Sequence, residues 1–192
     1  MEYVIGADKT YSADLDIPQQ RHVRPTLQVA RFAIQHFVID IKKGYFTMKL
    51  YFKKLDPRAT IPTYGTKLSA GADLRAILDA PITIQPSDTV FLHTGIAVAI
   101  PEGYVGKIYA RSGIACKRGL APANKTGIID ADYRGEIMVA LHNHSTSAQT
   151  VEPNERIAQM VVESFVRCDY EEVNDLDVTD RGEGGFGSTG KQ

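Results

Sequence analysis

Short apolar runs separated by turn-forming residues constrain the fold of this chain more than any other feature. From Met48 onward they recur at regular spacing, at 48–55, 81–84, 90–92, 95–100, 105–110, 137–141 and 157–166. Turn clusters lie between them, as at 85–88, 101–103 and 152–155. Spacing of this kind predicts an all-β fold, a sandwich or a jelly roll. We expect one short helix, at 113–118, closed at its end by Gly119.

The segment 127–135 reads Gly-Ile-Ile-Asp-Ala-Asp-Tyr-Arg-Gly and carries a dense set of functional groups. Its first residues, 127–130, are typical of the end of a strand. A turn is indicated at 133–135 and a second strand at 136–141, so the pattern predicts a β-hairpin. Asp130 and Asp132 would share a face if the first strand reached Asp132. An acid beside an aromatic can hold a flat ligand and place a base near it. The alternative is a solvated acidic hairpin tip.

The two ends of the chain differ from its middle. We expect an N-terminal extension of uncertain order at 1–47, a β domain at 48–175 and a C-terminal arm at 176–192. Thr26 could cap a helix that runs to Phe37, although 38–41 could equally be a strand. Met48 also reads as a plausible translation start. The arm contains five glycines between 180 and 190, so by itself it should be mobile, yet glycine backbone can wrap an anion closely.

Composition excludes several classes of function. The net charge of −1 argues against binding to long nucleic acid, so an anionic ligand must be met by local Arg and Lys. No apolar run approaches the roughly 18 residues of a membrane span. The N-terminus lacks the basic-then-apolar order of a signal peptide. Cys116 and Cys168 fit no metal spacing and are typical of free thiols. We expect a cytoplasmic protein that is not bound to a membrane.

Two short segments are candidates for phosphate and metal chemistry. Arg111-Ser112-Gly113 lies where a strand ends and a helix begins, and helix N-termini suit phosphate. A simple helix start with Ser112 as its cap is the alternative. Asp73 follows a glycine in the segment 70–74, and such a carboxylate could hold water on a Mg²⁺ ion. An ordinary turn aspartate is the alternative there.

Three other patterns carry less weight. Residues 185–191 nearly match the phosphate-binding loop G-x-x-x-x-G-K-[ST], but Gln192 follows where Ser or Thr is needed. His142 and His144 have a metal-ligand spacing without an evident third ligand, so we interpret them as polar residues at a strand end. Tyr104 and Tyr109 are typical of aromatics in a core or on a sheet face.

Taken in order, five segments resemble the motifs of the trimeric dUTP diphosphatases (dUTPases). They are 70–74 (Ala-Gly-Ala-Asp-Leu), 111–113 (Arg-Ser-Gly), 127–135, 155–159 (Glu-Arg-Ile-Ala-Gln) and 181–190 (Arg-Gly-Glu-Gly-Gly-Phe-Gly-Ser-Thr-Gly). The resemblance runs from about Met48 to the C-terminus and does not reach 1–47. Two residues depart from the family pattern beside these contacts. Ala110 stands where proline is usual, and Asn154 stands where glycine is usual.

The resemblance implies a β jelly roll of the β-clip type that assembles as a homotrimer. Three active sites would lie between subunits, and the arm of one subunit would close a site formed by the others. The implied reaction is dUTP + water → dUMP + diphosphate, with Mg²⁺ on the phosphates. It would keep uracil out of DNA and supply dUMP for thymidylate synthesis.

Roles follow by matching positions. Asp130 would orient and deprotonate the attacking water. Asn124 would bind the uracil edge together with the segment's backbone, and Tyr133 would pack under the deoxyribose and leave no room for a 2′-hydroxyl. The full nucleoside pocket would comprise Asn124, Gly127, Ile128, Ile129, Tyr133 and Met138.

The resemblance also implies the groups that hold the phosphates. These would be Arg111, Ser112, Gly113 and Gln159, with Asp73 acting through Mg²⁺ waters. From the arm, Phe186 would stack on uracil and Gly187 would be a further substrate contact. The terminal phosphates would be reached by Arg181, Ser188 and Thr189. Two alternatives stay open at this point. One is a dCTP deaminase, which shares the fold, and the other is a regulatory module that binds a partner through 1–47 and uses nucleotide as a switch.

Overall fold

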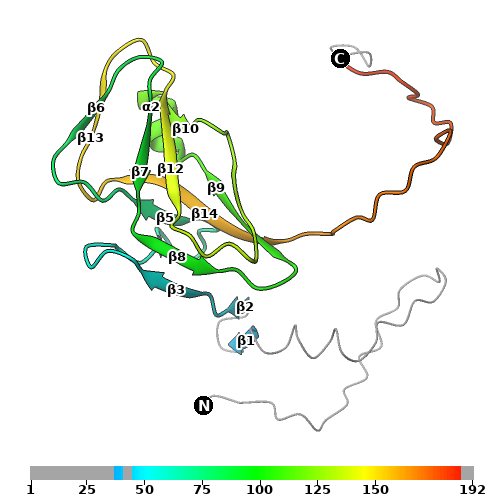
Figure 1. Cartoon of the computed structure of the whole chain (residues 1–192), viewed down its shortest axis with the longest axis horizontal. Helices are drawn as coiled ribbons and strands as arrows, with labels where there is room; N and C mark the ends of the chain where they lie inside the picture. The colour runs from blue at the N-terminus through cyan, green and yellow to red at the C-terminus, as the bar shows by residue number, and fades with distance from the viewer. Residues whose placement is uncertain (1–36, 41–44, 187–192) are drawn as a thin grey trace, which may run out of the picture.

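The computed structural model describes residues 37–40 and 45–186, and its body is built almost wholly of β-strands (Figure 1). One sheet has five strands, in the order β11 (Gly127–Ile129), β9 (Tyr104–Tyr109), β14 (Arg156–Ser164), β5 (Ala72–Arg75) and β4 (Thr63–Tyr64). A second has three, β10 (Leu120–Pro122), β12 (Met138–Asn143) and β7 (Thr89–His93). Three strand pairs complete the described topology: β13 (Gln149–Val151) with β6 (Ile82–Ile84), β3 (Tyr51–Lys54) with β8 (Ile96–Ala99), and β1 (Phe37–Asp40) with β2 (Tyr45–Met48).

The apolar core fills the space between these sheets. Alternate residues of β12 point inward, so that Val139 and Leu141 are buried while Met138 is exposed. The fully buried side chains include Leu74, Leu92 and Ile157, which come from three different strands. Full burial of such a side chain stabilises the fold by about 1.5–3 kcal/mol. This arrangement confirms the expected all-β jelly roll.

The one helix in the described part of the body, α2, spans Ser112–Arg118, which confirms the expected short helix. It ends because Gly119 adopts a left-handed conformation with φ 68° and donates its N–H to the Ala115 carbonyl at 3.0 Å. Ile114 is buried and anchors the helix to the core. The cap position at the other end belongs to Arg111 and not to Ser112, and no side chain caps the first turn.

The predicted hairpin at 127–141 is wrong in its pairing. Strands β11 and β12 form near the expected positions, but β11 pairs with β9 while β12 pairs with β10 and β7. The segment 130–137 therefore crosses between two sheets. Strand β11 ends at Ile129, so Asp130 and Asp132 follow the strand and share no strand face. An apolar pattern locates a strand but does not name its partner, because pairing depends on residues distant in sequence.

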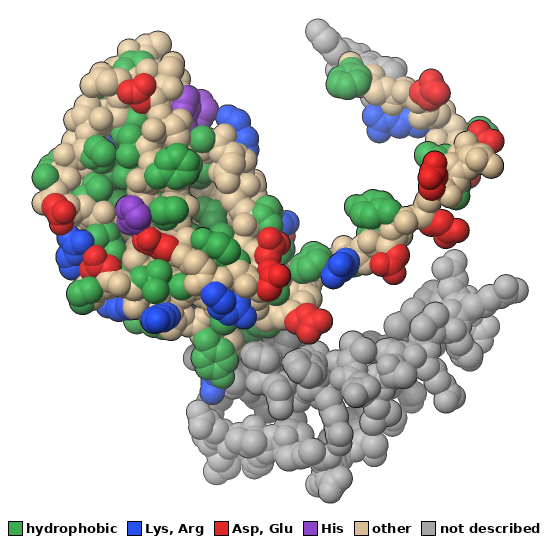
Figure 2. Space-filling model, viewed as in Figure 1, with side chains coloured by type: hydrophobic (Ala, Val, Ile, Leu, Met, Phe, Trp, Pro, Cys, Tyr) green, Lys and Arg blue, Asp and Glu red, His purple; other side chains and the backbone are tan. Residues whose placement is uncertain are grey.

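Beyond Ser164 the described chain contains no further strand and runs away from the body as an extended arm (Figure 1). Large apolar side chains on it are almost fully exposed, among them Tyr170, Val178 and Phe186. Acidic residues are spaced along the same segment (Figure 2). At the other end, β1 agrees with the strand that the sequence analysis left open as an alternative at 38–41, over the described residues Phe37–Asp40. The helix expected after Thr26 lies outside the described residues.

Candidate active site

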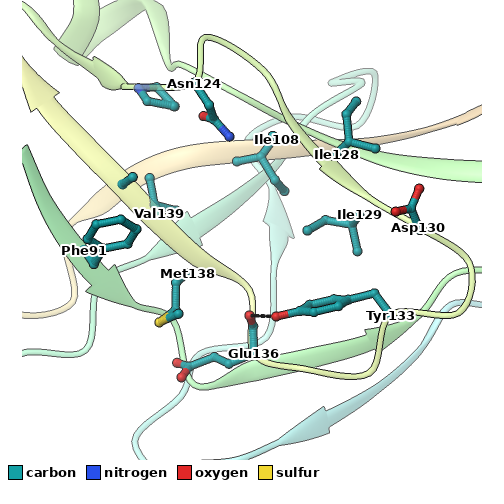
Figure 3. Close-up of a pocket in the computed structure, with 13 residues that line it drawn as sticks. Phe91, Ile108, Asn124, Ile128, Ile129, Asp130, Tyr133, Glu136, Met138 and Val139 are labelled. Atoms are coloured by element: carbon teal, nitrogen blue, oxygen red, sulfur yellow. Dashed lines mark hydrogen bonds between the residues drawn. The ribbon is translucent and has the colours of Figure 1, made fainter.

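The segment that follows β11 borders a cavity of about 280 Å³ beside β12, which we call cavity 1. The residues of the body predicted to bind the nucleoside or to activate water all line it, and most are labelled in Figure 3: Asn124, Gly127, Ile128, Ile129, Asp130, Tyr133 and Met138. Phe91 and Glu136 also line this cavity and were not expected there. Most of its lining residues are apolar, and Asn124, Asp130 and Glu136 add polar groups, as is usual for a small-molecule pocket.

The ring of Tyr133 has a defined place in cavity 1. Its hydroxyl donates to the Glu136 carbonyl at 2.9 Å (Figure 3). Its backbone N–H donates to the Asp130 carbonyl at 3.2 Å. Gly135 makes this possible, since a Cβ atom at that position would lie 2.4 Å from the Tyr133 hydroxyl. The glycine that closes the segment is therefore required by the packing of the aromatic ring.

A second cavity of about 480 Å³, cavity 2, lies beside the N-terminal end of α2. Its lining includes the residues of the body predicted to hold phosphates or metal waters: Asp73, Arg111, Ser112, Gly113 and Gln159. The lining charges are two arginines, Arg111 and Arg156, against the single carboxylate of Asp73, so one net positive charge remains. Such a site suits an anion.

Asp73 holds both arginines of cavity 2. Its Oδ1 accepts a bond from Arg111 Nε at 2.6 Å, and its Oδ2 accepts one from Arg156 Nη1 at 3.1 Å. Only 9% of the Asp73 side chain is exposed. A buried carboxylate needs such partners, because burial of an unpaired charge is costly. The arginines keep further N–H donors that can face a ligand.

Gln159 is oriented by its neighbours. Its Nε2 donates to the Ala110 carbonyl at 2.8 Å. A Cβ atom on Gly71 would lie 2.4 Å from Gln159 Oε1, so the glycine in the segment 70–74 leaves room for this amide. Gly113 differs, because a Cβ atom there would meet nothing within 4 Å. The packing of the chain therefore does not require a glycine at position 113. A ligand that approaches the backbone closely would require one, because a side chain would occupy its space.

The two cavities lie on opposite faces of the five-stranded sheet. Consecutive residues of a strand point to opposite faces, and on β9 Ile108 lines cavity 1 whereas Tyr109 lines cavity 2. Tyr109 pairs with Gln159, which in turn pairs with Asp73, so these three share one face. Cavities 1 and 2 have no lining residue in common.

Comparison with known proteins identifies the family to which the chain belongs. The family model described as dUTPase matches residues 57–190. The chain belongs to the dUTPase family. Among curated relatives, the deoxyuridine 5'-triphosphate nucleotidohydrolase of Paraburkholderia phymatum is 46% identical over 147 residues, which cover 75% of this chain and 99% of that one. The protein of the same name from Aeromonas salmonicida is 43% identical over 151 residues, covering 76% and 99%.

Solved structures agree with this assignment. The Staphylococcus bacteriophage 80alpha dUTPase with dUPNHPP matches with a TM-score of 0.65 and 29% identity, over 75% of this chain and 99% of that one. A mutant of the same phage enzyme matches with a TM-score of 0.67 and 29% identity, covering 73% and 98%.

The two departures from the dUTPase pattern have structural outcomes. Asn154 adopts φ 62°, the left-handed conformation that favours glycine and that asparagine tolerates. It therefore keeps the turn that glycine would form, and its Oδ1 also accepts a bond from Thr60 Oγ1 at 3.1 Å. Ala110 still presents its carbonyl to Gln159, as a proline at that position could.

The two described arm residues of the dUTPase pattern, Arg181 and Phe186, line neither cavity. Arg181 Nε donates to the Gly184 carbonyl at 2.8 Å, within the arm itself, and Phe186 is fully exposed. Gly187, Ser188 and Thr189 lie outside the described residues. The described part of the arm therefore does not reach either cavity of its own chain, and the roles expected of the arm stay predictions.

Residues 37–40 and 45–186 contain no cluster of three His, Cys, Asp or Glu side chains that could hold a metal. His142 and His144 stack edge to face, and His142 Nδ1 bonds to Thr89 Oγ1 at 2.8 Å. Mg²⁺ usually binds through one or two carboxylates together with substrate phosphates and waters. Asp73 is the only carboxylate lining cavity 2, which fits an ion that arrives with its substrate.

Several residues that line the cavities had no site role in the sequence analysis, among them Phe91 and Glu136 in cavity 1 and Arg156 and Tyr109 in cavity 2. Arg156 stood in a matched motif without a role, and Tyr109 was interpreted as an aromatic of the core or of a sheet face. Both lie on the face that carries Gln159, and strand alternation in β14 and β9 was the signal that could have found Tyr109.

No helix of the described residues is both long and apolar enough to cross a membrane.

Proposed function

We propose that this protein hydrolyses dUTP to dUMP and diphosphate. The observation that carries the proposal is that the expected contact residues fall into two groups, a nucleoside cavity and a cationic cavity, with none of the described ones left elsewhere in the body. The reaction would lower dUTP and supply dUMP. We assign it to the cytoplasm, where free deoxynucleotides are handled.

Cavity 1 would select the base and the sugar. The amide of Asn124 and the backbone of Ile128 and Ile129 would bind the uracil edge. Cytosine presents the reversed donor and acceptor there, and buried polar groups left unpaired can discriminate by roughly 10⁴-fold or more. Thymine would be excluded by the close approach of the same backbone. Tyr133 would pack under the deoxyribose and exclude a 2′-hydroxyl.

Asp130 would act as the general base at the rim of cavity 1. It would orient a water molecule and take its proton as the oxygen attacks the α-phosphorus. A carboxylate is a weak base, so most of the rate would come from positioning and from stabilisation of phosphoryl charge. Arg111, Ser112, Gly113 and Gln159 would bind the phosphates. A Mg²⁺ ion held through water by Asp73 would supply further charge neutralisation when bound.

The arrangement of the cavities supports a site shared between copies of the chain. Because cavities 1 and 2 occupy opposite faces of one sheet, a single nucleotide could not fill both in one copy. We propose a homotrimer in which cavity 1 of one copy faces cavity 2 of the next, with the arm of a copy closing the site. Closure would exclude water other than the nucleophile.

Diphosphate release from dUTP, dTTP, dCTP and UTP, with Mg²⁺ and with a chelator, tests the proposal. We expect release from dUTP alone, lost on chelation. Ammonia release from dCTP would instead favour the deaminase alternative. No product from any nucleotide would refute the hydrolase and favour a regulatory module.

A further inference from the structure

The segment 130–135, which carries Asp130 and Tyr133, joins two different sheets. Its hydrogen bonds among the described residues stay within 130–136: Tyr133 N–H to Asp130, Arg134 Nη1 to the carbonyls of Ala131 and Tyr133, and the Tyr133 hydroxyl to Glu136. Such a segment needs an anchor on the body if its aromatic ring is to hold one position. Glu136 is the residue that supplies one.

The carboxylate of Glu136 bonds to the turn between β7 and β8. Oε1 accepts from the Gly95 N–H at 2.7 Å, and Oε2 accepts from His93 Nδ1 at 2.8 Å. The Glu136 side chain is 20% exposed, so its bond to the Gly95 N–H is partly shielded from water, whereas the His93 side chain is 61% exposed. A hydrogen bond between a backbone N–H and an ionised carboxylate is about twice as strong as a neutral one.

The turn that receives this carboxylate is itself fixed. Gly95 has φ 66°, and a Cβ atom there would lie 2.4 Å from Ile77 Cδ1. The buried Thr94 hydroxyl donates to the Ile137 carbonyl at 2.6 Å, directly after Glu136 in the chain. The anchor therefore connects the crossing segment to a part of the core that cannot shift easily.

We propose that Glu136 is a positioning residue for sugar selection. Its carboxylate fixes the residue on the β7–β8 turn, and its carbonyl then fixes the Tyr133 hydroxyl at 2.9 Å (Figure 3). The two contacts set how far the Tyr133 ring stands into cavity 1. The inference rests on the proposed function, because it concerns the ring that would discriminate deoxyribose from ribose.

The test compares kcat/KM for dUTP and UTP in Glu136→Ala, Glu136→Gln and Tyr133→Phe. Glu136→Ala removes the acceptor of the Gly95 N–H, and we expect the dUTP-to-UTP ratio to fall by about tenfold or more, as a small misplacement of a contact group can do. Glu136→Gln keeps one acceptor and should restore the ratio to within about threefold of wild type. Tyr133→Phe loses the bond to the Glu136 carbonyl and should lower the ratio too. Glu102→Ala, at an exposed turn outside both cavities, is the matched control.

Binding of dUpNHpp and of its ribose counterpart, measured by calorimetry on the same variants, separates this inference from the proposed function. Wild-type protein that prefers the deoxy analogue but releases no diphosphate would refute hydrolysis and leave the positioning role testable by binding. An equal loss for both sugars in Glu136→Ala, with a lower Tm and an unchanged ratio, would overturn the inference and show a structural role only. If Glu136→Ala does not fold, an unchanged ratio in Tyr133→Phe would overturn it.

Discussion

Gly71→Ala tests how cavity 2 is organised. The new Cβ would lie 2.4 Å from Gln159 Oε1 and 3.0 Å from Gln159 Cδ, so the amide must move. Because the shortest clash is with the end of a flexible side chain, the amide can rotate away, but it would lose its 2.8 Å bond to the Ala110 carbonyl. The contact with Gln159 Cβ, at 3.2 Å, needs a further shift of a few tenths of an ångström. A bond of this type contributes about 0.5–1.5 kcal/mol.

The expected effect on stability is therefore small and the effect on activity large. One kcal/mol shifts Tm by about 2–4 °C in a protein of this size, so we expect a decrease of a few degrees. Displacement of the Gln159 amide should lower kcat/KM for dUTP by roughly 10²-fold. Thermal unfolding and diphosphate release, measured on the same preparation, provide both quantities.

Gly65→Ala is the matched control for stability, since Gly65 also lines cavity 2 but a Cβ atom there would meet only Ser69 Oγ, at 3.8 Å. It should keep the Tm of the wild type. Wild-type activity in Gly71→Ala would refute the argument that Gln159 needs this glycine. Global unfolding of that variant would refute it as well, because the clash would then involve more than one side chain.

Three further predictions concern catalysis, the arm and acid stability. Asp130→Asn should lower kcat by about 10²–10⁴-fold while calorimetry shows dUpNHpp still binding, and near-normal turnover would remove Asp130 as the base. A chain that ends before Arg181 should keep its circular dichroism and oligomeric state but lose most activity, whereas an unfolded product would make the arm structural. The Lys107 ammonium, 2.7 Å away, lowers the pKa of Glu163 below its usual 4.5. The stabilisation is therefore present above about pH 4.5 and is lost as pH falls through the folded-state pKa. Glu163→Gln should accordingly flatten the acid side of the Tm–pH curve, and an unchanged curve would count against the pair.

Much of the fold could be predicted because its signals are local. Gly119 ends α2 where the sequence analysis expected, since a left-handed residue is needed there and glycine supplies it. Most strands lie near the predicted apolar runs, because the alternation that marks a strand is also a local signal. The pairing of β11 could not be predicted, because the 127–141 pattern fits a hairpin as well as a crossing between sheets. Only contacts distant in sequence, such as Ile129 with Gly106, decide between the two.

The candidate site shows the same division. The matched motifs identified Asp73, Arg111 and Asp130, but not that they separate onto two faces of a sheet. That separation depends on which way Ile108 and Tyr109 point, and so on the register of β9. Glu136 was missed because a glutamate after a turn glycine has no local signature. Its role follows from the Gly95 N–H, 41 residues away in sequence.

Mixing two inactive variants tests the central claim most directly. Asp130→Asn disables cavity 1 and Arg111→Gln disables cavity 2, and the two chains can be co-expressed in equal amounts. If each site combines cavity 1 of one copy with cavity 2 of the next in a closed ring, about a quarter of the sites would be intact. Our account predicts dUTP hydrolysis near a quarter of the wild-type rate. Activity no higher than that of the separate variants would contradict a shared site and show that each copy carries its own.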